Sequence, residues 1–398
     1  MVNALPGLLP GSTSRLNALW ARWNHVAVPV LLWVGLVVQS GLAAWWFQGP
    51  ADPKWPGTGA SFIGAWGHLD SVWYVRIAAE GYAYSDDGAS AWAFFPAYPA
   101  LVRAVAAVTG SSAAVAGYAV ALVLGLGALL VVRAFAAVWL PPKRAALAAS
   151  AFAVYPYSFF LRGPLYTDGM AFVFVVGAFL AVERRRIALG CLLAFLASYT
   201  RFEVVPLTIA LTWRAWELRP QGDRRRSAIA LLPAGFAVLG QGLVSAYSLY
   251  RVHDPIAFYH AQSYAGWQGG SVADRLMKRG YVLRLAGFVG GREGDAKSLA
   301  LETMGLLAVV GACCLVPLVA RRMSRAYAAF VIATIVMVVA GAASFCSSGR
   351  YLLACFPCFV VLAGLGPPRA RWIVVAVALA IATQTVFAIG FARGALVG

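Results

Sequence analysis

Long apolar runs recur along the chain, from Val26 to Phe391. At about 17–25 residues each, such runs are long enough to cross a lipid bilayer as helices. The composition agrees, because 61% of the 398 residues are hydrophobic and only 12% are charged. A soluble domain carries about 25% charged residues. The sequence therefore predicts an all-α polytopic membrane protein and excludes an ordinary soluble globule.

The net charge is +17, from 32 basic and 15 acidic residues. In a soluble protein this excess would suggest nucleic acid as a partner. Here the basic residues lie in short loops between apolar runs, where they orient the chain with its positive loops in the cytoplasm. No soluble stretch combines a basic face with interleaved aromatic residues, so we expect membrane lipids as partners and no nucleic acid.

The basic clusters fix a predicted orientation, because positive loops face the cytoplasm. Arg15 and Arg22 precede the first run, and five clusters follow: 143–144, 184–186, 224–226, 321–325 and 369–371. Placing all of them inside leaves the outer loops as 48–112, 162–168, 200–203, 251–300 and 344–349. We expect the first run, Val26 to Phe47, to be a retained helix, since it is longer than the apolar part of a signal peptide.

Segment 94–108 is apolar but short, and it contains two prolines and Arg103. If it crossed the membrane, the 143–144 cluster would lie outside. We therefore expect a re-entrant or interfacial segment packed under the first outer loop, with about eleven full crossings elsewhere. The whole chain, 1–398, is predicted to form one integral membrane domain, with 48–112 and 251–300 as its two large outer loops.

The unusual polar residues gather in the predicted outer loops and at outer helix ends. They are His68, Asp70, Glu80, Asp86, Asp87, Asp168, Arg201, Glu203, His253, Asp254, His260, Gln262, Arg350 and Tyr351. Ionisable residues near membrane depth are candidates for function, so this distribution predicts chemistry at the outer face.

Asp70 is the most informative of these residues. Read as a helix, residues 66–82 form an interfacial segment with aromatic residues and an Arg76–Glu80 pair one turn apart. Asp70 either caps this helix or acts as a catalytic base, and spacing alone does not choose. The capping interpretation also applies to Asp168, which stands at the start of an apolar run.

Two arginines on the outer side are candidates for binding an anion. Arg201 lies at the tip of a predicted hairpin, and Arg350 with Tyr351 opens an apolar run. The alternatives are a snorkelling side chain for Arg201 and a structural salt bridge for Arg350.

We expect no cofactor, and no metal is required. Asp86 and Asp87 could bind a divalent ion, but paired acids in a polar loop are more often simply solvated. A metal site of His68, His253 and His260 is a weaker alternative. Cys355 and Cys358 lack a second pair of ligands and lie in an apolar run, which argues against zinc.

Six stretches follow one another along the chain: 70–82 with 93–99, 155–161, 166–168, 199–201, 254–258 with 261–262 and Trp267, and 349–353 with 356–357. Together they resemble one family, the GPI mannosyltransferase II-like proteins, which are integral membrane glycosyltransferases of the GT-C superfamily. The stretches extend over most of the chain, from Trp66 to about Gly364.

The chain departs from the family pattern at three places. Leu69, preceded by His68, stands where the family has an aromatic residue before the loop Asp. Thr167-Asp168 replaces Ser-Glu, and Phe202-Glu203 follows Arg201 in place of small or polar residues. These changes leave the acceptor open.

The resemblance implies a GT-C-type transmembrane bundle that transfers mannose, with inversion, from a polyprenyl-phosphate-mannose donor on the outer face. Asp70 would accept the proton of the acceptor hydroxyl, and Arg350 and Arg201 would bind the donor phosphate. Further substrate-binding candidates are His68, Tyr74, Asp168, His260, Gln262 and Tyr351.

The alternatives are a GT-C transferase for another polyprenyl-phosphate sugar, a lipid or solute transporter, and a non-catalytic assembly subunit. A transporter would place ionisable residues in mid-span, whereas here they gather at one end. High Ala, Val, Arg and Gly content suggests a bacterial cytoplasmic membrane. A lipid-linked or envelope glycan is then the expected acceptor.

Overall fold

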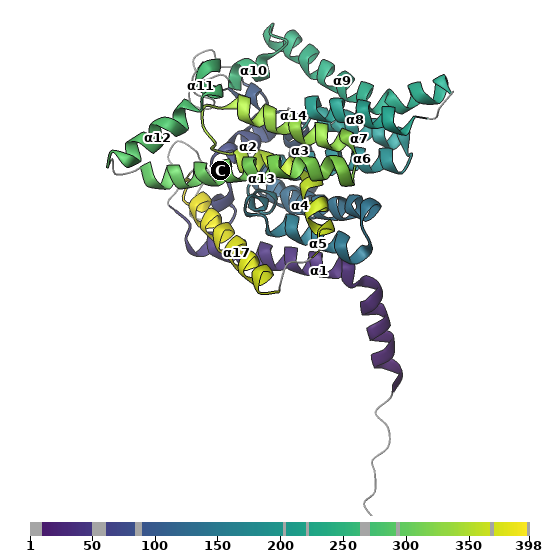
Figure 1. The fold of residues 1–398 in the computed structure, drawn as a ribbon. Coiled ribbons are helices and arrows are strands. Elements are labelled where there is room, and N and C mark those ends of the chain that lie inside the picture. The colour runs from purple at the N-terminus through teal and green to yellow at the C-terminus, as the bar shows by residue number, and fades with distance from the viewer. Residues whose placement is uncertain are drawn as a thin grey trace, which may run out of the picture.

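The computed structural model describes residues 10–49, 61–83, 90–201, 204–219, 223–262, 271–291, 295–366 and 370–395. Within these ranges every regular element is a helix (Figure 1). The predicted all-α class is confirmed.

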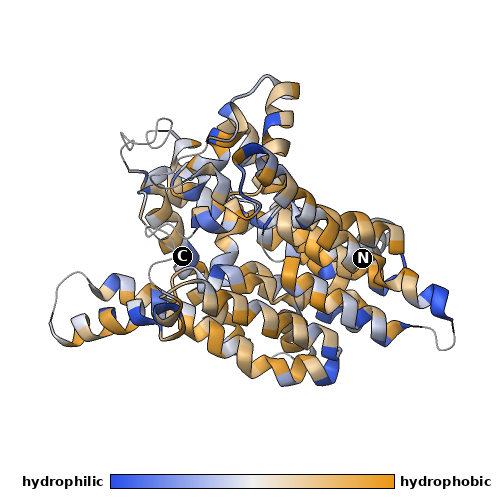
Figure 2. Ribbon diagram, turned by 90° about the horizontal axis from the view of Figure 1, so that it is seen from above, coloured by the Kyte–Doolittle hydropathy of each residue, from blue (hydrophilic) through white to orange (hydrophobic). Residues whose placement is uncertain are grey.

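Among the described residues, five helices contain a segment long and apolar enough to cross a membrane. They are α1 (Pro10–Trp46), α4 (Ala113–Trp139), α9 (Arg224–Val252), α13 (Asp295–Arg322) and α17 (Ala370–Ala392). Large apolar side chains such as Leu31, Val123 and Leu379 are exposed on them, and orange residues run along most helices in Figure 2. The molecule is a helical membrane protein.

Six shorter helices stand where the other predicted crossings fall. They are α5 (Pro142–Val154), α6 (Asp168–Glu183), α7 (Ile187–Ser198), α8 (Val204–Leu218), α14 (Arg325–Gly341) and α16 (Phe356–Gly364). Their lengths run from 9 to 17 residues, below the roughly 20 that a straight crossing needs. The count of about eleven crossings therefore stays a prediction.

The segment predicted as the first outer loop, 48–112, contains α2 (Asp70–Glu80) and α3 (Ala97–Thr109). At 13 residues, α3 is about 20 Å long and, like the six shorter helices above, falls below the roughly 20 residues that a straight crossing needs. Arg103 of α3 donates from Nε to the Ala78 carbonyl at 2.6 Å and from Nη2 to the Ile77 carbonyl at 3.2 Å. The segment thus packs against the outer-loop helix, as predicted.

The helix predicted over 66–82 is wrong at its start. A short 3₁₀ turn, η1 (Gly64–Trp66), precedes α2, and the helix begins only at Asp70. Leu69 has a φ of 55°, which is outside the helical region and prevents a continuous helix from Trp66 to Asp70. The spacing of apolar residues gives no sign of this conformation. The Arg76–Glu80 pair is confirmed, at 3.0 Å.

The remaining elements are short: η2 (Ala91–Ala93), η3 (Pro156–Leu161), α10 (Ala257–Gln262), α11 (Val272–Leu276), α12 (Arg279–Val289), α15 (Ser348–Tyr351) and η4 (Leu352–Ala354). Helix α6 lies at the centre, with most of its residues buried. Its first turn contacts the backbone of α4, since a methyl added at Gly169 would lie 3.0 Å from the Gly125 nitrogen. This close packing fixes the position of Asp168.

Candidate active site

Asp168 is the centre of a cluster of four charged side chains: Asp70, Asp168, Arg201 and Arg350. We call it the outer cluster, after the predicted position of these residues in outer loops. Arg350 donates from Nη2 to Asp168 Oδ2 at 2.9 Å and from Nε to both oxygens at 3.2 Å. Arg201 donates to Asp168 Oδ1. The three residues come from α15, the connection between α7 and α8, and the start of α6, so the cluster joins distant parts of the chain.

Asp70 is the most accessible member. Arg350 reaches it from Nη1 at 3.4 Å, a longer contact than its bonds to Asp168. The Asp70 side chain is 36% exposed, whereas that of Asp168 is 0% and that of Arg350 is 5% exposed. Arg350 therefore bridges one buried carboxylate and one carboxylate that solvent or substrate can reach.

The carboxylate of Asp70 does not cap α2. The N-cap position belongs to Leu69, and no side chain bonds there. The φ of 55° and ψ of −131° at Leu69 lie in a region that residues with a Cβ rarely occupy and that costs about 1–3 kcal/mol. The Asp70 amide donates to the Tyr166 hydroxyl at 3.2 Å. The backbone thus holds Asp70 at the helix start and leaves its carboxylate for the cluster.

Aromatic rings surround the arginines. The Arg350 guanidinium lies 4.2 Å from the Tyr166 ring centre and 4.9 Å from that of Phe160, and Arg201 lies 4.7 Å from that of Tyr351. Such cation–π contacts hold the guanidinium groups in place. Burial raises the pKa of the Tyr166 hydroxyl well above its usual value, so this group stays protonated.

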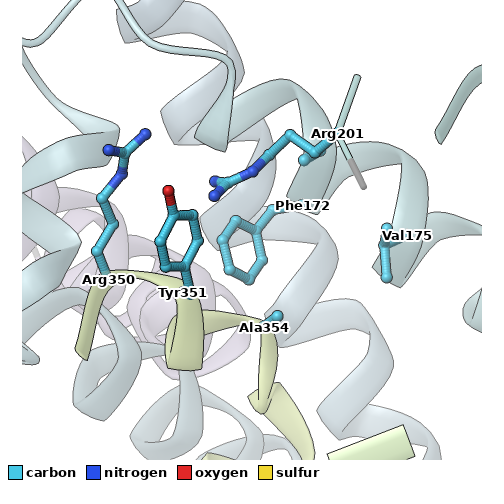
Figure 3. A pocket seen from close by; sticks show the side chains of 7 residues that line it. Phe172, Val175, Arg201, Arg350, Tyr351 and Ala354 are labelled. Atoms are coloured by element: carbon cyan, nitrogen blue, oxygen red, sulfur yellow. The ribbon is translucent and has the colours of Figure 1, made fainter. Parts of the chain in front are cut away.

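The pocket beside the cluster is amphipathic. Arg201, Arg350 and Tyr351 line it together with Ala171, Phe172, Val175 and Ala354. In Figure 3 both guanidinium groups and the Tyr351 hydroxyl lie on one side, and the apolar side chains lie beyond them. A ligand with an anionic head and an apolar tail has the matching chemistry.

The other substrate-binding candidates lie in different surroundings. Tyr74 of α2 is buried with its ring 6.2 Å from that of Tyr166, next to the cluster. His68 packs against the end of α17, and its ring lies 6.4 Å from that of Phe391. On α10, His260 bonds Asp254 at 2.7 Å, and Gln262 donates to the Ala93 carbonyl at 3.1 Å. The structure thus joins Tyr74 to the cluster but gives His68, His260 and Gln262 other contacts.

No group of three His, Cys, Asp or Glu side chains that could hold a metal occurs among the described residues. Asp86 and Asp87 lie outside them. Cys355 and Cys358 are buried and unbonded to each other.

Some residues of the site were not predicted from sequence. Tyr166 and Phe160 contact Arg350, yet they stand in motifs noted only for resemblance. Ala171, Phe172 and Val175 lie on one face of α6, where their spacing is that of any packed helix face. Ser71 accepts from the Leu165 amide at 3.0 Å and ties α2 to the chain before Asp168.

No family model matches the chain, and no curated protein matches it. The resemblance in the six stretches therefore stays a prediction.

Proposed function

We propose that the protein is a GT-C-type membrane glycosyltransferase. It transfers mannose from polyprenyl-phosphate mannose to a lipid-linked or envelope glycan on the outer face of a bacterial cytoplasmic membrane. One observation carries the proposal: a partly exposed carboxylate, Asp70, shares Arg350 with a buried carboxylate beside an amphipathic pocket. The family resemblance of the six stretches supplies the identity of the sugar and its carrier.

The charges of the outer cluster suit a single displacement. Two arginines and two carboxylates give it a net charge of zero. The acceptor oxygen bonds to the anomeric carbon, the bond from that carbon to the phosphate oxygen breaks, and the acceptor proton passes to Asp70. As Asp70 becomes neutral the cluster gains one positive charge, while the departing polyprenyl phosphate gains one negative charge. The arginines therefore stabilise the leaving group most strongly when its charge develops.

The lining of the pocket matches the chemistry of an amphipathic donor. Phe172, Val175 and Ala354 offer apolar contact to the first isoprene units, and Arg201 and Arg350 offer hydrogen bonds to the phosphate. Asp168 holds both guanidinium groups, which fixes their orientation before the donor arrives.

The direct test is sugar transfer by the purified protein. It is incubated with radiolabelled polyprenyl-phosphate mannose and a membrane lipid extract, in parallel with Asp70→Asn. The matched control is Glu80→Gln, which changes an exposed carboxylate of the same helix. We expect label in the glycolipid fraction with wild type and Glu80→Gln and almost none with Asp70→Asn. No transfer by wild type would remove the mannosyltransferase proposal, and transfer only from another polyprenyl-phosphate sugar would change the donor.

Orientation is tested separately. In a variant whose six native cysteines are replaced by serine, Arg225→Cys, in a predicted inner loop, and Ser271→Cys, in a predicted outer loop, are treated one at a time in intact cells with a membrane-impermeant maleimide. We expect labelling of the second position alone. The reverse pattern would place the outer cluster in the cytoplasm and contradict the proposed site of reaction.

A further inference from the structure

A second set of buried charges surrounds the segment that leads into Arg350. Residues 342–347 connect α14 to α15 without helical structure and precede Arg350 by only a few residues. Non-helical backbone leaves carbonyl groups that need donors from elsewhere. The position of Arg350 therefore depends on whatever bonds this connecting segment.

Lys278, from the junction of α11 and α12, supplies those donors. Its ammonium group donates to the carbonyls of Val339, Ala342 and Ser344, the last two at 2.7 and 3.4 Å. An ammonium has three hydrogens, and each has an acceptor here. The side chain is 7% exposed and lies 5.0 Å from the centre of the Phe345 ring. The Lys278 ammonium group is therefore a buried cation that is hydrogen-bonded to three backbone carbonyl oxygens.

The backbone around Lys278 docks on the same segment. Lys278 has a φ of 52°, which is unusual for a residue with a Cβ. The Gly280 amide donates to the Ala343 carbonyl at 3.0 Å. A methyl on Gly280 would come within 3.1 Å of that oxygen, so the α11–α12 junction and the connecting segment fit closely.

Helix α13 closes the other side. Glu302 is 2% exposed and pairs with Arg284 of α12 at 2.6 Å, which ties α12 to α13. A methyl on Gly305 would lie 2.1 Å from the Phe345 carbonyl. The connecting segment is thus enclosed between α13 and the α11–α12 junction.

We propose that Lys278 is a positioning residue that holds the Arg350-bearing segment from the second large outer loop. A contact of that loop with a substrate or partner would then change the geometry of the outer cluster. The catalytic consequence rests on the proposed function, whereas the effect on the segment does not.

The first experiment measures amide hydrogen exchange in the detergent-solubilised full chain. Lys278→Met keeps the alkyl stem over Phe345 and removes the ammonium. Lys297→Ala is the matched control, since Lys297 is an exposed lysine of α13. We expect exchange in 342–351 to rise by about tenfold or more with Lys278→Met and to stay unchanged in the control. Equal exchange in the two variants would overturn the proposal.

Chemical rescue distinguishes the loss of the ammonium hydrogen bonds from the loss of side-chain packing at position 278. Lys278→Ala leaves room for methylammonium, which has the same three N–H donors, whereas tetramethylammonium has the charge and no donor. We expect methylammonium, and not tetramethylammonium at equal ionic strength, to restore protection in 342–351. The proposal would be contradicted if the two salts restored protection equally, or if neither salt restored it.

A milder variant covers the case in which the lysine variants do not fold. Gly280→Ala displaces the same junction without removing a charge, and we expect its increased exchange to be confined to 342–351. A uniform increase along the chain, or no increase, would contradict the proposal.

Transfer kinetics test the catalytic consequence. Lys278→Met should raise the donor KM by about tenfold while the acceptor KM stays unchanged, because Arg350 faces the donor phosphate. Lys278→Ala should regain the wild-type donor KM in methylammonium. If Lys278→Met shows the expected exchange but the wild type transfers no sugar, only the proposed function is contradicted. If the wild type transfers sugar but Lys278→Met leaves exchange in 342–351 unchanged, only the role of Lys278 is contradicted.

Discussion

Helix α6 carries a buried carboxylate at each end, and the two ends have different surroundings. Asp168, its first residue, bonds Arg350 and Arg201 in the outer cluster. Glu183, its last residue, bonds Arg214 through two parallel contacts of 2.7 and 2.9 Å and also accepts from the Tyr327 hydroxyl. We call Glu183, Arg214, Glu217 and Tyr327 the inner cluster.

The inner cluster is closed. Arg214 donates its third bond to Glu217 Oε2 at 2.9 Å, and the Ala326 amide donates to the other Glu217 oxygen at 3.3 Å. Each carboxylate oxygen in it therefore has a donor. In the outer cluster, by contrast, the Asp70 carboxylate accepts a single bond, at 3.4 Å, from the residues that the structure describes. The same residue types thus form a fully hydrogen-bonded ion-pair network at the Glu183 end of α6. Near the Asp168 end they leave a carboxylate, that of Asp70, that can accept further hydrogen bonds.

The largest expected effect separates the two clusters by activity. Asp70→Asn should lower transfer by about 10²–10⁴-fold, because an amide cannot accept the acceptor proton. Glu217→Gln, in the inner cluster, should leave transfer unchanged. Initial rates at saturating donor provide the measurement. Equal losses in both variants would mean that the open carboxylate has no special role.

Removing the buried carboxylate at either end should destabilise the protein. Breaking a buried ion pair costs about 3–5 kcal/mol, because a charge is left without its partner. Asp168→Asn removes the carboxylate that bonds both Arg201 and Arg350, whereas Glu183→Gln removes one of the two carboxylates that bond Arg214. We therefore expect the larger decrease in the free energy of unfolding for Asp168→Asn.

Urea unfolding in mixed micelles checks this order. The control is Glu80→Gln, whose exposed pair should contribute less than about 1 kcal/mol. A larger loss for Glu183→Gln than for Asp168→Asn would contradict this order and make Glu183 the more stabilising of the two buried carboxylates.

Substitution by lysine should have different effects at Arg214 and at Arg350. Arg214→Lys loses the parallel contacts with Glu183, so we expect a stability loss of about 1–3 kcal/mol and little change in transfer. Arg350→Lys keeps the charge but loses its bridge between Asp70 and Asp168. Its kcat/KM for the donor should fall by about tenfold or more. Transfer assays and unfolding of both variants measure the contrast, and unchanged kcat/KM in Arg350→Lys would argue against a phosphate-binding role.

The all-helical class was predictable because it follows from run length and composition, which are local properties. Asp70, Asp168, Arg201 and Arg350 were identifiable as candidates because charged residues at the predicted outer ends of helices are conspicuous in an apolar chain. Their mutual contacts were not predictable. Arg350 bonds residues 182 and 280 positions away, and no spacing rule reaches that far.

Other features depend on tertiary packing in the same way. The inner cluster combines residues from α6, α8 and α14 that lie far apart in the sequence. The three carbonyl partners of Lys278 lie more than 60 positions away. His260 and Gln262 were singled out by residue type, yet α10 directs their bonds to Asp254 and Ala93.

The smallest expected effect concerns the backbone before Asp70. Leu69→Gly should raise the free energy of unfolding by about 1 kcal/mol, since glycine adopts this φ without a Cβ clash and loses part of the gain to chain entropy. The inner end offers a matched control, because Arg185, just after α6, also has a positive φ, of 57°. It occupies the usual place for that conformation, beyond a helix C-terminus, and donates to the Leu218 carbonyl at 2.9 Å. Arg185→Gly should therefore change stability by less than about 0.5 kcal/mol.

Transfer by Leu69→Gly then shows whether the strain has a use. If the backbone holds Asp70 toward Arg350, a more flexible residue 69 should lower kcat a few-fold even as stability rises, the trade-off expected where strain fixes a reacting group. Arg185→Gly should leave kcat unchanged. If Leu69→Gly gains no more stability than Arg185→Gly, the backbone before Asp70 is no more strained than the backbone after α6. The two clusters would then differ only in the unused hydrogen-bonding capacity of the Asp70 carboxylate.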